Sequence, residues 1–447
     1  MVKLWQKDYK LNEKIEKFTV GNDYLLDKVL IKYDIYASLA HAFMLNKIGI
    51  LKDKEFKKLK GALIGIIRVK KVPFEIEPQD EDVHTALENY LTEKLGELGK
   101  KIHTARSRND QVLVDLRLYS KEKLHEVRKL VLELALNLIN SAEKNKEVPM
   151  PGYTHSRKAM PSSVGMYLCS FAESLMDGIK VLENAHNINN QCPLGSGAGY
   201  GLPLNVNREL TASILGFEKV QANSLYVQNS RGKIESMIIF SLSFVMDDLA
   251  RLANDLVIFS MDEFGFFSLP DEFCTGSSIM PQKINPDVLE LMRAKSAKVN
   301  SNLFLVKNIA SKLQSGYSRD LQLTKEPLIE SFDITLSSLE IFNLIFKNLQ
   351  VNMEKCTGAC TPELYATGQA YELVKRGISF RDAYKKIALE IGSLKMPDPV
   401  ISIKSGKHTG STGNLGLEKT REKLINKKKE LELEIEEYNG KIRNLLI

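Results

Sequence analysis

The segment TGSSIMPQKINPDVLELMR, residues 275–293, combines two serines, a lysine and an asparagine in a loop punctuated by glycine and proline. A helical apolar pattern follows this loop directly. Asn285 is suited to cap the helix, Pro286 to occupy its first position, and Asp287 to complement the positive end of its dipole. Hydroxyl, ammonium and amide groups are therefore predicted to lie at a helix N-terminus, where an anionic ligand is favoured.

Four other polar segments interrupt the helical patterns: DEDVHTALE (80–88), HTARSRNDQ (103–111), PGYTHSRKAMPSS (151–163) and LGSGAGYG (194–201). Each lies at the end of a predicted long helix, where loops converge and backbone amides are free. A site built between the helices of a bundle needs this placement.

Together these segments predict recognition of a carboxylate. Arg106, Arg108, Asn109, Lys283 and Asn285 supply hydrogen-bond donors and positive potential, and no acidic cluster has the sequence spacing of metal ligands. The sequence therefore indicates no metal site, and proton transfer is expected from side chains.

His155, which follows Thr154, is the best candidate acid or base, because the seven histidines are scattered and form no H-x-x-x-H pair. A hydrogen-bonded core histidine is the alternative, and Arg106 and Arg108 could simply cap a helix. The Gly-rich segment 194–201 fits no G-x-G-x-x-G register and follows no predicted strand, which argues against a dinucleotide site.

The elements that must position these residues are long helices. Glycine and proline are absent from residues 100–148, 233–264, 287–315 and 328–357, and apolar residues recur there at helical spacing. A further helix is predicted from about Pro161 to His186. Strand patterns are nearly absent, so the predicted fold class is all-α. The stripe in the first window consists of Leu113, Leu116, Leu124, Val127, Val131, Leu134 and Leu138.

Helices of this length cannot each bury an apolar stripe within one compact chain. An elongated bundle that forms a multi-subunit helical core is therefore expected. The charged tail from Leu417 to Gly440 is predicted to be a helix with Leu424, Leu431 and Ile435 on one side. The predicted domains are an N-terminal mainly helical domain (1–105), the central long-helix bundle (106–350) and a small C-terminal helical domain (351–447).

Composition narrows the class of partner. The net charge of +6 and the pI near 8.7 fall short of the strongly basic balance of nucleic-acid binders, so a small anionic ligand is expected instead. Five cysteines without a Cys-x-x-Cys pair indicate a reducing cytoplasm. The N-terminus lacks a signal-peptide pattern, and the longest apolar run (237–246) is too short to span a bilayer.

The segment from Gly276 to Asn285 resembles the signature loop of the fumarase/aspartase superfamily of lyases, G-S-S-x-M-P-x-K-x-N, which a glutamate (here Glu290) follows. Within that superfamily, HTARSRNDQ, PGYTHSRKAMP, the glutamine of MPQK and GYSRDLQLTKE (316–326) are similar to the argininosuccinate lyase family. The similarity extends over roughly residues 17–385.

The resemblance implies a β-elimination without metal or cofactor, which yields L-arginine and fumarate in arginine biosynthesis. Ser277 would be the base on a mobile loop, and His155 the general acid. The family also implies a homotetramer whose active sites are shared among three subunits, with a small dicarboxylate substrate. The substrate-binding positions implied are Arg108, Asn109, Thr154, Lys283, Asn285, Tyr317, Gln322 and Lys325.

The chain departs from the family pattern at several positions. Ser156 and Arg157 replace the usual Leu-Gln after the histidine, Ile284 replaces a lysine of the loop, and Gly21 aligns with a contact serine. In segment 223–235, Arg231 is the only residue of the family pattern that remains. Three alternatives stay open. The first two are a related lyase acting on another succinyl adduct such as adenylosuccinate, and a non-catalytic structural member of the family. A helical-bundle interaction protein outside the family is the third.

Overall fold

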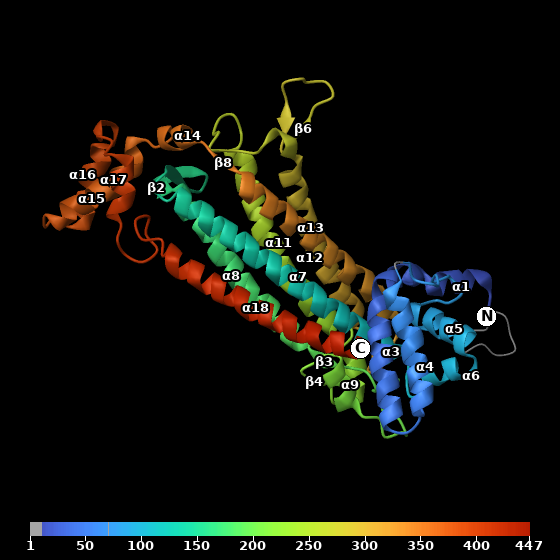
Figure 1. The fold of residues 1–447 in the computed structure, drawn as a ribbon. Coiled ribbons are helices and arrows are strands. Elements are labelled where there is room, and N and C mark those ends of the chain that lie inside the picture. Colours follow the sequence, from blue (N-terminus) through green and yellow to red (C-terminus); the bar gives the residue numbers. More distant parts are fainter. Residues whose placement is uncertain (1–10, 70) are drawn as a thin grey trace.

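The computed structural model describes residues 11–69 and 71–447. The chain is elongated and mainly helical (Figure 1), which confirms the predicted all-α class. Its centre is a bundle of long helices that lie side by side. They are α7 (Arg108–Lys144), α8 (Val164–Asn189), α11 (Lys233–Phe259), α12 (Asp287–Ala310) and α13 (Lys325–Asn348).

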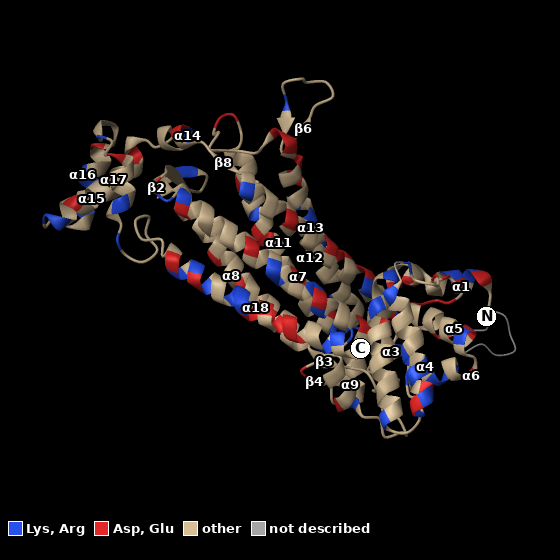
Figure 2. Cartoon of the chain, viewed as in Figure 1, with Lys and Arg blue, Asp and Glu red and all other residues tan. Residues whose placement is uncertain are grey.

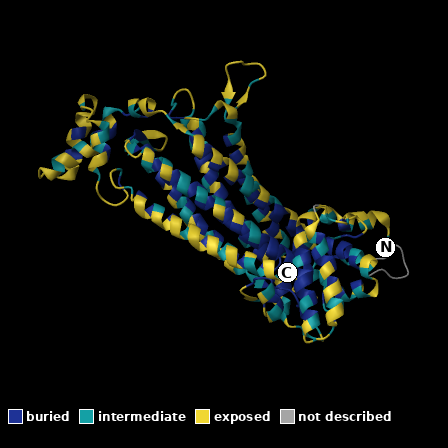
Figure 3. Ribbon diagram, viewed as in Figure 1, coloured by how far each residue is buried: buried dark blue, intermediate teal, exposed yellow. Residues whose placement is uncertain are grey.

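The longest described helix is α7, with 37 residues. At a rise of 1.5 Å per residue it extends over about 55 Å. All seven residues of the predicted apolar stripe, from Leu113 to Leu138, are buried. All of them except Leu113 belong to the main core cluster, where α7 contacts α8, α13 and α18, and the dark interior in Figure 3 illustrates this core.

A β-hairpin follows α7 and was missed by the sequence pattern. Strands β1 (Pro149–Thr154) and β2 (Arg157–Ser163) pair antiparallel. The helix predicted to begin near Pro161 therefore begins only at Val164, where the Ser163 hydroxyl accepts a hydrogen bond from the backbone N–H of Met166.

The other strands of the described residues are two residues long. They are β3 (Gln191–Cys192) with β4 (Lys219–Val220), β5 (Phe267–Ser268) with β8 (Gln350–Val351), and β6 (Thr275–Gly276) with β7 (Ile284–Asn285). Asn285 was predicted to cap α12, but it lies in β7 and its side chain makes no cap hydrogen bond. Pro286 occupies the cap position, and α12 begins at Asp287.

Shorter helices flank both ends of the bundle. The N-terminal set packs around its own core cluster, which α3 and α4 dominate. The set consists of α1 (Glu13–Val20), α2 (Asp23–Leu26), α3 (Ile31–Lys47), α4 (Asp53–Arg68), α5 (Val83–Leu95) and α6 (Glu97–Lys100), with 3₁₀ turns η1 (Asp27–Leu30) and η2 (Lys101–His103).

The second set lies between and beyond the long helices. It consists of α9 (Arg208–Ile214), α10 (Ser224–Asn229), η3 (Asp271–Phe273), η4 (Arg319–Thr324), α14 (Met353–Gly358), η5 (Pro362–Tyr365), α15 (Ala366–Lys375), α16 (Phe380–Leu389), η6 (Ile391–Ser393) and α17 (Pro399–Ser405). Helices α15 to α17 form a largely exposed group at one end of the molecule (Figure 3).

The last helix, α18 (Leu417–Leu446), runs back along the bundle beside α7. Leu424 and Leu431 are buried against it and Ile435 is partly buried, while charges of both signs cover the outer face (Figure 2). The division of the chain at residues 105 and 350 stays a prediction, and α18 connects the last of these parts to the bundle. Among the described helices, none is both long and apolar enough to cross a membrane.

Candidate active site

A pocket of about 150 Å³ lies where the N-terminal helices meet the bundle. Five predicted site residues line it: Arg108, Asn109, Tyr317, Gln322 and Lys325. Folding therefore brings the start of α7 and the segment around η4 to one place. The lining also includes Asp23, Asp27, Glu81, Asp82, His84, Val112, Arg231 and Arg319.

The start of α7 is fixed by a capping box. The Ser107 hydroxyl accepts from the amide of Asn109 (3.3 Å), and the Asp110 carboxylate accepts from the amide of Ser107 (2.9 Å). The second oxygen of Asp110 accepts from the amides of Gly195 (3.1 Å) and Gly197 (2.8 Å). The Gly-rich segment thus serves to hold the helix end that carries Arg108 and Asn109.

The Asp110 carboxyl is fully buried, and burial raises its pKa to about 6, although the amide donors of Ser107 and Gly197 oppose the rise. We expect Asp110→Asn to be less stable at neutral pH by roughly 1–3 kcal/mol, because its amide nitrogen cannot accept from a backbone N–H. Urea unfolding at pH 7 measures this loss.

The same variant has a pH signature with a definite sign. A carboxyl whose folded pKa is raised binds more protons in the folded state, so wild-type stability falls as pH rises from about 4 to about 6. The loss of unfolding free energy in Asp110→Asn relative to the wild type should therefore shrink as pH rises across this window and stay constant above it. A deficit that grows with pH would contradict the assignment.

Arg108 is already paired within the chain. Its guanidinium contacts Glu81 (2.8 Å) and Asp82 (3.2 Å) and also donates to the Thr85 hydroxyl. Predicted as a donor to a substrate carboxylate, Arg108 here joins the start of α7 to the loop before α5.

Lys325 is similarly enclosed. Only 1% of the residue is exposed, and its ammonium contacts Asp27 and, at 3.1 Å, Asp23. Burial alone lowers the pKa of Lys325, but Asp27 and Asp23 hold it above its usual value, so the lysine stays charged. The sequence carried no signal for these two aspartates, because they lie about 300 positions before the lysine.

The remaining pocket residues fix the segment that contains η4. The Gln322 amide donates to the carbonyls of Thr19 (3.2 Å) and Val20 (3.1 Å), beside Gly21. The guanidinium of Arg231, a buried residue, lies 5.6 Å from the centre of the Tyr317 ring. Arg231, the residue of segment 223–235 that matches the family pattern, therefore belongs to the candidate site.

Thr154 and His155 lie at the tip of the β1–β2 hairpin, away from this pocket (Figure 1 labels β2). His155 and Ser156 form a two-residue turn with φ of 52° and 58°. Both side chains are exposed, and Thr154 pairs directly with Arg157 in the register. The Tyr153 ring contacts Phe259 and so anchors the hairpin to α11.

Ser277, Lys283 and Asn285 belong to a third region. The β6–β7 pair closes the base of a loop that projects from the bundle (Figure 1). The Ser277 hydroxyl oxygen accepts from the backbone amides of Ile279 (3.3 Å) and Met280 (3.1 Å). Two amide donors on one oxygen stabilise negative charge there, which is the chemistry that a serine base requires.

These regions lie at opposite ends of the bundle. Asn109 is in the first turn of α7, and the hairpin begins five residues after α7 ends. The helix between them is roughly 50 Å long at 1.5 Å per residue. One chain therefore cannot place Asn109 and His155 around one small molecule.

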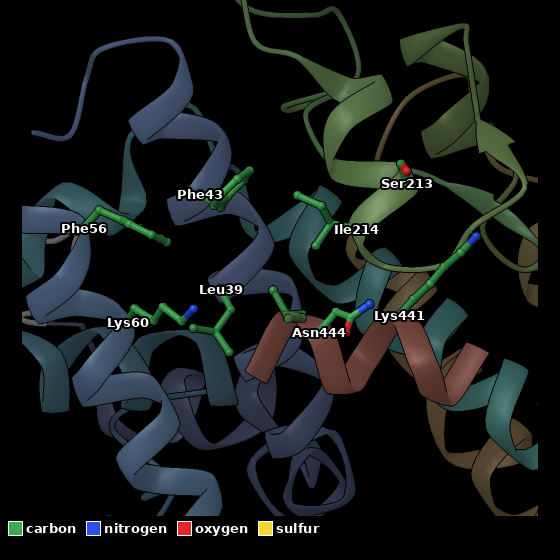
Figure 4. Close-up of a pocket in the computed structure, with 9 residues that line it drawn as sticks. Leu39, Phe43, Phe56, Lys60, Ser213, Ile214, Lys441 and Asn444 are labelled. Atoms are coloured by element: carbon green, nitrogen blue, oxygen red, sulfur yellow. The ribbon is translucent and has the colours of Figure 1, made fainter. Parts of the chain in front are cut away.

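A larger cavity has different chemistry. It measures about 300 Å³ and lies between α3, α4, α9 and the end of α18 (Figure 4). Leu39, Phe43, Phe56 and Ile214 dominate its lining, with Lys60 at its edge. None of the predicted site residues lines it, so size alone does not make it the active site.

Comparison with known proteins agrees with the sequence motifs. Residues 12–301 match the family described as Lyase. The argininosuccinate lyase of Thermotoga neapolitana is 49% identical over 88% of this chain and 99% of that protein. The argininosuccinate lyase of Sorangium cellulosum is 41% identical over 95% of this chain and 98% of that protein.

Solved structures share the fold at lower identity. EDDS lyase in complex with formate has a TM-score of 0.84 at 20% identity and covers 98% of this chain and 95% of its own. Class II fumarase from Schistosoma mansoni has a TM-score of 0.71 at 17% identity, covering 86% and 94%. The chain therefore belongs to the fumarase/aspartase superfamily of lyases and, within it, to the argininosuccinate lyase family.

Proposed function

We propose that the protein is an argininosuccinate lyase, which cleaves argininosuccinate to L-arginine and fumarate in arginine biosynthesis. The observation that carries this proposal is the 49% identity to a curated argininosuccinate lyase over 88% of the chain. The intact Ser277, Lys283 and His155 support catalysis over a purely structural role.

The difficult step is removal of a proton from a carbon next to a carboxylate, because it creates a dianionic intermediate. Ser277 is the proposed base, and the amides of Ile279 and Met280 already point at its oxygen. Lys283 and the start of α12 add positive potential to the loop. Gly276 and Pro281 suit a loop that closes over substrate.

His155 is the proposed general acid, which protonates the departing guanidino nitrogen. The turn presents its ring to solvent at the hairpin tip, where it is accessible to a second chain. Thr154 lies beside it as a substrate contact. Asn285, Asn109, Arg108, Tyr317, Gln322 and Lys325 complete the proposed binding set.

A complete site requires copies of the chain, because the proposed residues occupy opposite ends of one bundle. Apolar side chains on the outer face of the bundle suit such an assembly: Phe240, Phe244, Phe304 and Leu305 are 46%, 47%, 71% and 48% exposed. We propose a cytoplasmic homotetramer whose active sites combine residues of three subunits and take a small dicarboxylate substrate.

Ultraviolet absorbance of fumarate tests the activity directly. The purified protein is expected to release fumarate from argininosuccinate and to leave adenylosuccinate unchanged in a parallel assay. Folded, oligomeric protein that releases no fumarate from either substrate would indicate a non-catalytic member. Release of fumarate from adenylosuccinate alone would instead assign the chain the activity of the related lyase.

A further inference from the structure

Three side chains from three helices meet in the core behind the pocket. Asp34 of α3, His84 of α5 and Asp115 of α7 each place a ligand-type atom within 4.8 Å of the other two. Asp34 is 1% exposed, His84 5% and Asp115 0%. Their polar atoms are therefore out of reach of bulk water.

These side chains lack ordinary hydrogen-bond partners within the described part of the chain. Both oxygens of Asp34, both oxygens of Asp115 and both ring nitrogens of His84 are buried without a hydrogen bond. Leaving polar groups unsatisfied in a protein interior is costly. Six unsatisfied atoms in one place indicate that something else occupies the space among them.

The distances fit a shared cation better than direct hydrogen bonds. His84 Nδ1 is 3.3 Å from an Asp34 oxygen and 3.7 Å from an Asp115 oxygen, whereas N–H···O bonds centre on about 2.9–3.0 Å. Ligands at about 2.0–2.1 Å from a tetrahedral zinc ion are about 3.4 Å apart. The observed separations are close to that edge length.

The local charge also favours a cation. Lys325 forms ion pairs with Asp27 and Asp23, and its charge also acts on Asp115 without contacting it. Arg106, which donates to the Ser38 hydroxyl, is the other buried cation within electrostatic reach of Asp115. The carboxyl groups of Asp34 and Asp115 lie close together in this buried space, and burial of two neighbouring negative charges is costly unless a cation lies between them.

We propose that Asp34, His84 and Asp115 bind a divalent transition-metal ion of the zinc type. Two carboxylate oxygens and one imidazole nitrogen are a donor set that this class of ion accepts. The ion would connect α3 and α5 to α7. Because His84 also lines the pocket, it would fix the pocket wall to the helix that carries Asn109.

A second histidine cluster supplies the control. His125, His186 and Glu434 also have ligand-type atoms within 4.8 Å of one another, but both oxygens of Glu434 accept from Arg128, at 2.9 and 3.0 Å. A carboxylate that a guanidinium already holds is a poor metal ligand. Metal binding is therefore expected at the first cluster alone.

The test uses the full-length protein after dialysis against a chelator. In a titration with Zn²⁺, each chain should bind about one equivalent of the ion. Bound Co²⁺ should give the visible absorption of a tetrahedral site. Asp115→Asn should bind Zn²⁺ roughly 100-fold more weakly or worse, since even supporting residues of metal sites contribute 10–100-fold. His125→Asn should bind as the wild type does.

Two outcomes would overturn the proposal. One is wild-type protein that takes up no Zn²⁺ or Co²⁺, which would leave a proton shared among the three side chains as the occupant. The other is equal uptake by Asp115→Asn and wild type. If Asp115→Asn does not fold, loss of the Co²⁺ spectrum in His125→Asn but not in Asp34→Asn decides against the site.

Discussion

The Ser277→Ala variant is expected to release fumarate roughly 10²-fold or more slowly than the wild type, with unchanged helical content. The hydroxyl is the proposed base, and the structure directs the amides of Ile279 and Met280 at its oxygen. Alanine removes the atom that takes the proton and leaves the loop backbone intact. Steady-state kinetics and circular dichroism measure the two quantities.

Ser278→Ala is the matched control, because Ser278 is the next residue of the same loop and is exposed. Its kcat should stay within a few-fold of wild type. Near-normal turnover in Ser277→Ala, or an equal loss in both variants, would assign the base elsewhere. A loss confined to KM would indicate substrate binding rather than proton transfer.

Mixing two inactive variants is expected to restore activity. Asn109→Ala removes a proposed substrate contact at one end of α7, and His155→Asn removes the proposed acid beyond the other end. If one site takes these residues from different chains, about one quarter of the sites in randomly mixed 1:1 oligomers keep both. Each variant alone should stay nearly inactive.

The measurement is fumarate release by mixed oligomers that carry two affinity tags and are purified through both. Wild type mixed 1:1 with the Asn109→Ala/His155→Asn double variant is the control. If Asn109 and His155 of one site come from separate chains, about one quarter of the sites in this control should be intact. If one chain contributes both residues, about one half should be intact. No recovery in the mixture of single variants would show that one chain supplies both residues.

Local patterns predicted the long helices well, because helical periodicity depends on nearby residues. The stripe from Leu113 to Leu138 is buried as expected. The β1–β2 hairpin was missed because prolines at 149, 151 and 161 break any alternating pattern. Its turn places His155 and Ser156 at positive φ without the usual Asn-Gly signal. Packing of Tyr153 against Phe259 supports it from outside the segment.

The sequence predicted a set of cationic and amide donors, but it did not indicate which acidic groups pair with them in the pocket. Glu81 and Asp82 hold Arg108, and Asp27 holds Lys325. The pairing of Asp27 with Lys325 spans 298 positions, a separation at which spacing along the chain carries no information. The roles of the site residues therefore stay predictions that the variants above test.

The sequence alone determined the all-α class and the family, because these depend on short-range spacing and on motifs. Tertiary structure alone decided which charges neutralise one another, that Asn109 and His155 lie at opposite ends of α7, and that Asp34, His84 and Asp115 meet in the core. Each of these depends on how separate helices pack, and a buried charge is satisfied by its neighbours in space rather than by those in sequence.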